Sequence, residues 1–136
     1  MKQQGDEKMS CPFCERIRAR DYTAERASAV AFPDTFPLTP GHTLVVPRRH
    51  LTVLGQFEPD ELTDLWLLGT SLCPDLQREH GTSAFNLGLN LGPAAGQTIE
   101  HVHLHVIPRY EGDVEDPRGG IRWIIPERAR YWLAEP

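Results

Sequence analysis

The segment Gln97–Arg109, which reads QTIEHVHLHVIPR, constrains the fold of this chain more than any other stretch. Its three histidines, His101, His103 and His105, alternate with aliphatic residues. Alternation with a period of two predicts a half-buried strand whose successive side chains point to opposite faces. Side chains two residues apart then lie roughly 6.5–7 Å from one another on one face. One face of the strand therefore carries three imidazoles, half of the six histidines of the chain, and the other packs into a core.

A second long pattern predicts the main helix. Across Glu58–His80, leucines recur at intervals of three and four, acidic residues begin the segment, and Gly81 follows it. An interior proline, Pro74, predicts a break or bend near Leu72–Cys73 because proline removes a helical hydrogen bond.

Three further segments have the patterns of strands. Two are the apolar runs 27–32 and 42–47, and the third is the alternating segment 83–91. The glycine-rich turn 92–96 joins the third of them to the histidine strand, which predicts an antiparallel hairpin. Strands and one main helix in a chain of 136 residues predict a single α+β domain.

Charge and composition narrow the class of partner. The 14 basic and 19 acidic residues give a net charge of −5, and no basic run is longer than Arg48-Arg49, which argues against a nucleic-acid-binding module. No run approaches the ~20 apolar residues of a membrane span. Met1–Ser10 is polar and lacks the apolar centre of a signal peptide. We therefore expect a flexible tail over residues 1–10, a cytoplasmic location, and neither nucleic acid nor membrane as partner.

The cysteines point to a second site. Cys11 and Cys14 form the motif C-P-F-C, and the third cysteine, Cys73, stands alone in the predicted helix. In a reducing compartment a C-x-x-C pair is more often a metal or redox site than a structural disulfide. A zinc knuckle, a redox pair and two free thiols are the three interpretations of this motif, and zinc would need two more ligands.

Three interpretations compete for the H-x-H-x-H pattern. Its histidines could be ordinary residues on a solvated strand, ligands of a catalytic metal, or a nucleophile with its supporting groups. The turn before the strand, with the sequence GPAAGQT, can present backbone N–H groups and small side chains to an anion. This turn favours nucleophilic catalysis on a phosphate, although glycines alone are also typical of a plain hairpin loop.

The combined stretch GPAAGQT-IE-HVHLHVIPR resembles the signature of the histidine-triad (HIT) superfamily, in particular its Fhit-like branch of dinucleotide hydrolases. The resemblance covers roughly residues 11–126. It extends to the segments 31–42, 45–50, 90–92 and 112–126, the last of which is similar to the C-terminal region of bacterial diadenosine polyphosphate hydrolases. The resemblance implies a HIT-like fold over residues 11–136, with an antiparallel sheet of about five strands, one main helix and short helices.

The resemblance also implies a mechanism. His103 would attack the α-phosphorus of a nucleotide and form a nucleotidyl-histidine, which water would then hydrolyse. A backbone carbonyl is the expected partner of the other ring nitrogen of His103. His105 would hydrogen-bond a non-bridging phosphate oxygen. His42 matches the fourth active-site histidine of the family, although a solvent-facing histidine at the start of a strand is the plain alternative.

Further residues match binding positions of the family. Asp34 matches a contact to the ribose hydroxyls and Asn90 an amide position near the phosphates, although either could be a turn residue. Gly96, Gln97 and Thr98 would help to hold the phosphate or the leaving group. The Fhit-like turn favours dinucleoside polyphosphates such as diadenosine tetraphosphate. An amine in a phosphoramidate, or an acyl or sulfate group, stays open as the leaving group.

Two broader alternatives remain. The chain could be a non-catalytic nucleotide-binding or scaffold protein, or a metallohydrolase that uses the histidine triad as ligands. The resemblance implies a two-fold homodimer with a small-molecule nucleotide substrate and no organic cofactor.

A subset of the family, and the related galactose-1-phosphate uridylyltransferases, pair a C-x-x-C motif with two histidines. This implies a structural zinc site, closed and tetrahedral. Its ligands would be Cys11, Cys14, His50 and His101.

Overall fold

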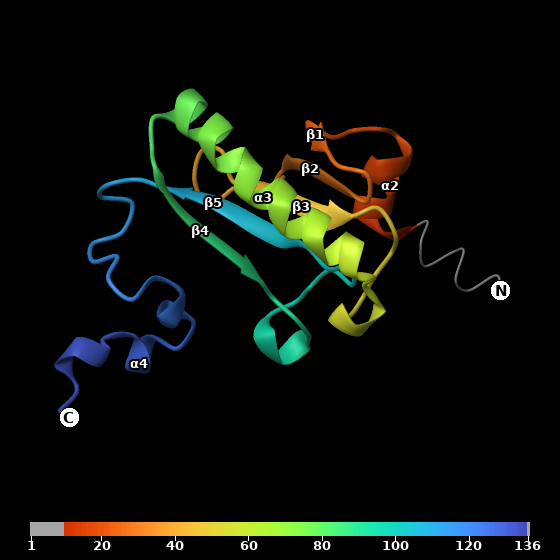
Figure 1. Cartoon of the computed structure of the whole chain (residues 1–136). Coiled ribbons are helices and arrows are strands. Elements are labelled where there is room, and N and C mark those ends of the chain that lie inside the picture. The colour runs from red at the N-terminus through yellow and green to blue at the C-terminus, as the bar shows by residue number, and fades with distance from the viewer. Residues whose placement is uncertain (1–9, 136) are drawn as a thin grey trace.

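The computed structural model of the protein describes residues 10–135. Its five strands form one antiparallel sheet in the order β1-β2-β3-β5-β4 (Figure 1). The strands are β1 Ala24–Glu25, β2 Ala29–Pro33, β3 Thr43–Pro47, β4 Ala84–Leu89 and β5 Leu104–Arg109. The predicted α+β class and five-stranded sheet are confirmed. The predicted flexible tail, residues 1–10, lies outside the described residues except for Ser10.

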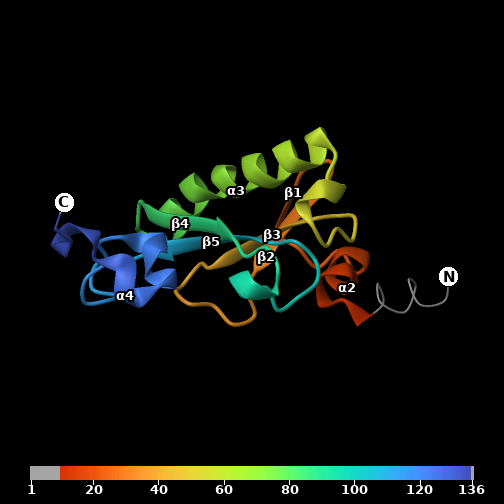
Figure 2. The same cartoon turned by 90° about the horizontal axis from the view of Figure 1, so that it is seen from below.

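One long helix, α3 (Pro59–His80), covers one face of the sheet (Figures 1 and 2). Its leucines at 65, 68, 72 and 76 are buried against Val45, Leu104 and Val106 of the central strands. The helix begins with proline in its first turn and ends at Gly81, whose φ of 76° is the left-handed geometry of a helix cap. Within residues 10–135 no helix is long and apolar enough to cross a membrane.

The predicted break in this helix is wrong, because α3 continues through Pro74 to His80. Leu72 and Leu76, on either side of the proline, are both buried in the same core. Burying both leucines stabilises the helical path by more than one lost backbone hydrogen bond costs.

The opposite face of the sheet is shared by two segments (Figure 2). At one end, α2 (Pro12–Arg18) packs Phe13 against Phe32 and Leu44. Both faces of β2 are thus covered, which explains its unbroken apolar run. At the other end lies the C-terminal segment, residues 110–135. It contains short helices, which are η3 Gly120–Ile124, α4 Pro126–Ala129 and η4 Tyr131–Leu133, and two further 3-10 helices precede it at η1 Leu54–Gln56 and η2 Pro93–Ala95.

The histidine strand is shorter than the alternation predicts. Strand β5 begins at Leu104, so only His105 of the three histidines lies in it. The ladder to β3 ends there, because the carbonyl of Pro47 accepts a hydrogen bond from the His101 side chain instead. The alternation of faces still holds, since Leu104 and Val106 pack toward α3 while the histidines lie on the opposite face. The predicted hairpin is confirmed, with β4 antiparallel to β5 and Gly88 opposite His105.

Candidate active site

His103 has one ring nitrogen fixed and the other free to react. Its Nδ1 lies 2.8 Å from the backbone carbonyl oxygen of His101. A carbonyl oxygen only accepts hydrogen bonds, so Nδ1 carries the proton. In the neutral ring Nε2 then holds a lone pair, as a nucleophile requires. The expected backbone partner of this histidine is therefore present in the structure.

His42 and His105 form a relay that fixes a second tautomer. The backbone N–H of Leu38 donates to Nδ1 of His42 at 3.0 Å, so Nε2 of His42 carries the proton. That N–H donates to Nδ1 of His105 at 2.9 Å. Nε2 of His105 is therefore an N–H donor. The rings of His103 and His105 lie with centroids 5.1 Å apart, so a lone pair and a hydrogen-bond donor stand side by side.

The environment keeps this relay uncharged. Burial, together with the neighbouring rings of His103 and His42, lowers the pKa of His105 to about 4, against a smaller opposing effect of Asp34. Burial also lowers the pKa of His42, and Asp34 opposes that shift. Both imidazoles are neutral at pH 7, which is the state that the hydrogen bonds between them need.

Asp34 lies beside the relay. Its Oδ2 is 3.4 Å from Nε2 of His42, and its Oδ1 accepts a hydrogen bond from the backbone of Phe36 at 2.9 Å. Oxygen and nitrogen atoms of Asp34, His42 and His105 lie within 4.8 Å of one another, close enough to hold a metal ion. The proton that His42 shares with His105 occupies the space between those two rings, and a metal there would break the relay.

The glycine-rich loop is held in shape by one of its own residues. Oε1 of Gln97 accepts from the backbone of Gly92 at 2.8 Å, and its Nε2 donates to the carbonyl of Ile99 at 3.0 Å. Gly96 adopts φ 91°, a left-handed conformation that suits glycine. The Gln97 amide is thus used inside the loop, while Thr98 on the same loop is exposed and Asn90 at the end of β4 is half-buried.

Four side chains gather into a metal-binding geometry. Nδ1 of His101 lies 3.5 Å from Sγ of Cys11, 3.6 Å from Sγ of Cys14 and 3.2 Å from Nδ1 of His50. Sγ of Cys14 and Nδ1 of His50 are 3.2 Å apart. A tetrahedral zinc with bonds of about 2.3 Å to sulfur and 2.0 Å to nitrogen separates its ligand atoms by roughly 3.3–3.8 Å. The four residues therefore fit such an ion.

This cluster is joined directly to the nucleophile. Nε2 of His101 donates to the carbonyl of Pro47 at 2.9 Å, which turns Nδ1 toward the cysteines, while the carbonyl of His101 holds His103. Phe13, between the two cysteines, contacts the rings of His101 and His103 with centroids 5.7 and 5.2 Å away. The sequence offered one signal for Phe13, an apolar residue inside a metal knuckle, but nothing that linked it to His103.

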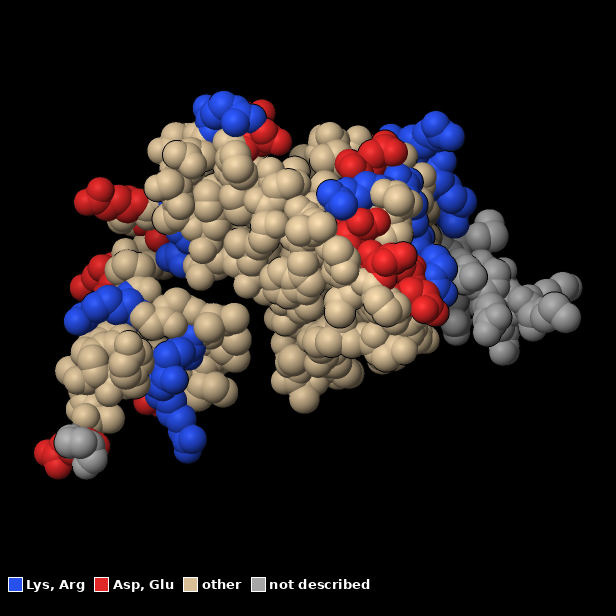
Figure 3. All heavy atoms as spheres, viewed as in Figure 1, with Lys and Arg blue, Asp and Glu red and all other residues tan. Residues whose placement is uncertain are grey.

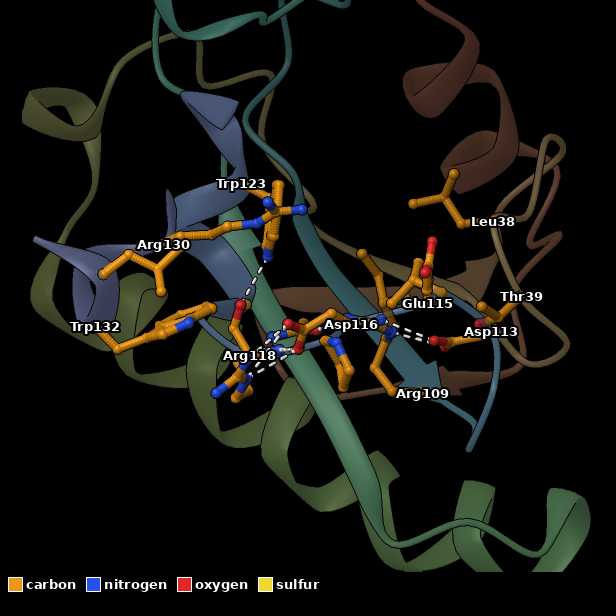
Figure 4. Close-up of a pocket in the computed structure, with 16 residues that line it drawn as sticks. Leu38, Thr39, Arg109, Asp113, Glu115, Asp116, Arg118, Trp123, Arg130 and Trp132 are labelled. Carbon is orange, nitrogen blue, oxygen red and sulfur yellow. Dashed lines mark hydrogen bonds and ion pairs between the residues drawn. The ribbon is translucent and has the colours of Figure 1, made fainter. Parts of the chain in front are cut away.

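A further cavity, shown in Figure 4, is lined by none of these histidines. It has a volume of about 840 Å³ and separates the β4–β5 face from the C-terminal segment. None of the predicted catalytic, phosphate-binding or metal residues lines it.

Comparisons with known proteins identify the family of this chain. The family model for the HIT domain matches residues 19–112. The bifunctional bis(5'-adenosyl)-triphosphatase/adenylylsulfatase FHIT of Arabidopsis thaliana is 43% identical over 79 residues, 58% of this chain and 44% of the plant protein. The asymmetrical bis(5'-nucleosyl)-tetraphosphatase of Schizosaccharomyces pombe is 39% identical over 88 residues, 65% of this chain and 48% of the yeast protein. The chain spans less than half the length of these two relatives.

A solved structure also resembles the whole fold. The crystal structure of a Zn-bound histidine triad family protein from Mycobacterium smegmatis superposes with a TM-score of 0.71 at 29% sequence identity. The match covers 94% of this chain and 99% of that chain.

Proposed function

Because this chain belongs to the HIT family, we propose that it hydrolyses dinucleoside polyphosphates at the α-phosphate of a nucleoside 5'-phosphate. Two of the relatives described above are named for such substrates, a triphosphatase and a tetraphosphatase. The observation that carries the proposal is the pair of fixed tautomers, a free Nε2 on His103 beside an Nε2–H on His105.

In the first step the Nε2 lone pair of His103 attacks the α-phosphorus. An N–P bond forms, and the P–O bond to the rest of the substrate breaks, with its electron pair leaving on the polyphosphate oxygen. The resulting ring is positively charged, and the carbonyl of His101 still accepts its Nδ1–H. The N–H of His105 stabilises the charge that develops on a non-bridging oxygen.

In the second step water replaces the histidine. A water oxygen attacks phosphorus and gives up a proton to the solvent, the N–P bond breaks, and its electron pair returns to Nε2 of His103. The charged imidazole is the better leaving group, so both halves of the displacement have lower barriers than a single direct hydrolysis. Asp34, Asn90 and the loop residues Gly96, Gln97 and Thr98 are proposed to hold the ribose and phosphates. For Gln97 this role is through the loop shape that its amide maintains.

The Cys11, Cys14, His50 and His101 cluster is proposed to bind one structural zinc ion. Its ligand distances support this, as does the zinc in the related mycobacterial structure. These four side chains would complete the tetrahedral coordination of the ion and leave no position open for water or substrate. The ion would therefore stabilise the fold. A cytoplasmic location, where thiols stay reduced, is part of this proposal.

A homodimer is proposed from two exposed features of the same side (Figure 3). Leu62, Trp66 and Leu67 on α3 are 40%, 39% and 45% exposed. The side of the molecule that carries α3 and β4 shows a broad central area without charged residues in Figure 3. The outer edge of β4 has no neighbouring strand among the described residues. An apolar patch beside an unpaired edge favours association. A sedimentation mass of two chains supports the dimer, and a mass of one contradicts it.

Product analysis tests the proposed activity. Diadenosine tetraphosphate and, in parallel, adenosine phosphoramidate are incubated with the wild type and with His103→Ala, and AMP is measured by chromatography. Formation of AMP by the wild type and its loss in the variant are expected. Equal turnover by both proteins would overturn the mechanism, and turnover of the phosphoramidate alone would reassign the leaving group.

A further inference from the structure

We propose that the cavity between the β4–β5 face and the C-terminal segment binds the second nucleoside of the substrate, the one that leaves with the polyphosphate. This inference rests on the proposed dinucleotide hydrolysis. The cavity volume of about 840 Å³ lies within the range of small-molecule sites. One wall comes from the sheet and the other from residues beyond 112, where the matched family region ends.

The cavity begins two residues along β5 from the proposed reacting groups. Ile107 lines it and points to the same face as His105, two residues earlier, at a spacing of roughly 7 Å. Leu38 also lines it, and the backbone of Leu38 donates the hydrogen bond that fixes His42. A substrate whose α-phosphate lies at His103 and His105 can therefore extend along β5 into the cavity through its phosphate linker.

Aromatic and guanidinium groups make up the far wall. Trp123 faces Leu38 and Thr39 across the cavity (Figure 4). Its Nε1–H donates to the carbonyl of Arg118 at 2.7 Å, which fixes the orientation of the indole. The Arg118 guanidinium lies 4.3 Å from the ring centroid of Trp132. Indole rings and guanidinium planes are the groups on which nucleic-acid bases stack.

The charges of the cavity suit a nucleoside better than a free phosphate chain. Arg109 pairs with Asp113 at 2.8 Å, and Arg118 pairs with Asp116 at 3.0 Å. These pairs leave little net positive charge inside, while their carboxylates can accept hydrogen bonds from a base or from ribose hydroxyls. A leaving group as small as an amine would fill only a minor part of the volume, so the cavity favours dinucleotides over phosphoramidates.

Substitution of Trp123 separates the two substrate classes. We would compare the kcat/KM of wild type, Trp123→Ala and Trp123→Phe on diadenosine tetraphosphate and on adenosine phosphoramidate. Ile124→Ala is the matched control, because the next residue in η3 is 72% exposed and does not line the cavity. We expect Trp123→Ala to lower kcat/KM for the dinucleotide by roughly tenfold or more, as loss of a base-stacking ring does. The phosphoramidate rate stays unchanged, and Trp123→Phe restores most of the loss.

The other outcomes are distinct. An equal loss on both substrates would mean that Trp123 only supports the fold, and would overturn the inference. An unchanged dinucleotide rate in Trp123→Ala, with both substrates hydrolysed by the wild type, would overturn it while leaving the proposed function intact. A wild type that hydrolyses the phosphoramidate but not the dinucleotide would overturn both the substrate assignment and this inference.

A binding measurement complements the kinetics. In the His103→Ala background, titration with diadenosine tetraphosphate is expected to change tryptophan fluorescence, while AMP leaves it unchanged. The additional substitution Trp123→Phe should remove most of that signal. An equal fluorescence change with AMP would contradict placement of the second nucleoside beside Trp123.

Discussion

Nε2 of His42 lies 2.9 Å from Nδ1 of His105, and this hydrogen bond leaves Nε2 of His105 as the N–H donor of the ring. If the two rings act as one unit, removing both should lower kcat no more than removing His105 alone does. We expect His105→Ala to lower kcat by about 10²-fold or more, as the loss of a transition-state donor does. His42→Ala should lower it less, and the double variant should match His105→Ala.

Initial rates on diadenosine tetraphosphate for the two single variants and the double variant complete this cycle. The double variant could instead be slower than the wild type by the product of the two single factors. That result would show that His42 acts independently of His105.

The lowered pKa of His105 predicts a pH-dependent stability. The pKa of this ring is about 4 in the folded protein and near 6.5 when unfolded, so between these values the unfolded chain binds more protons. Stability is therefore full above pH 6.5 and is lost progressively as the pH falls toward 4. Urea unfolding at pH 7 and pH 5 measures this loss, and His105→Gln should show a smaller difference. An equal difference in both proteins would contradict a shifted His105.

Metal removal should affect stability before it affects chemistry. About one zinc per chain is expected by elemental analysis after purification without chelator. Cys14→Ser should lose the metal, and Tm should fall by roughly 10 °C or more, because metal binding by a closed site contributes to folding. Cys73→Ala is the control, since that thiol lies on α3 and is not part of the cluster. A metal-free wild type of unchanged Tm would refute the structural zinc.

Phe13 is expected to position the nucleophile. The centroids of the Phe13 and His103 rings are 5.2 Å apart, and Phe13 is 5% exposed. Phe13→Ala therefore leaves a gap beside the imidazole. A small displacement of a reacting group can cost up to about 10²-fold, so kcat should fall by between about ten- and a hundredfold with zinc retained. Leu68→Ala on α3 is the control for lost stability alone. An unchanged kcat in Phe13→Ala, with intact metal content, would contradict this role.

Much of the fold and of the candidate site follows from local patterns. The alternation of histidines assigns their face correctly, because side-chain direction along an extended chain depends only on residue number. The predicted metal set, Cys11, Cys14, His50 and His101, lies together as the resemblance implied. The helix from 58 to 80 and the β4–β5 pairing have strong periodic signals, and both are present in the structure.

Other features depend on distant contacts that a single sequence does not display. Strand β1 has two residues and is defined by its pairing with β2 alone. The unbroken path of α3 through Pro74 depends on a core formed with β5, and the early end of the β5 ladder depends on the Pro47 carbonyl. The contact of Phe13 with His103 joins residues ninety positions apart, so neither its spacing nor its composition indicated it.

A transient covalent bond between Nε2 of His103 and the α-phosphorus is the step on which the proposed hydrolysis depends. Rapid acid-free quenching of wild type with diadenosine tetraphosphate, followed by intact mass measurement and peptide mapping, tests it directly. We expect a transient adenylyl adduct on the peptide that contains His103, absent from His103→Ala and decaying as AMP appears. Hydrolysis by the wild type with no adduct at any time, together with undiminished turnover in His103→Ala, would contradict it.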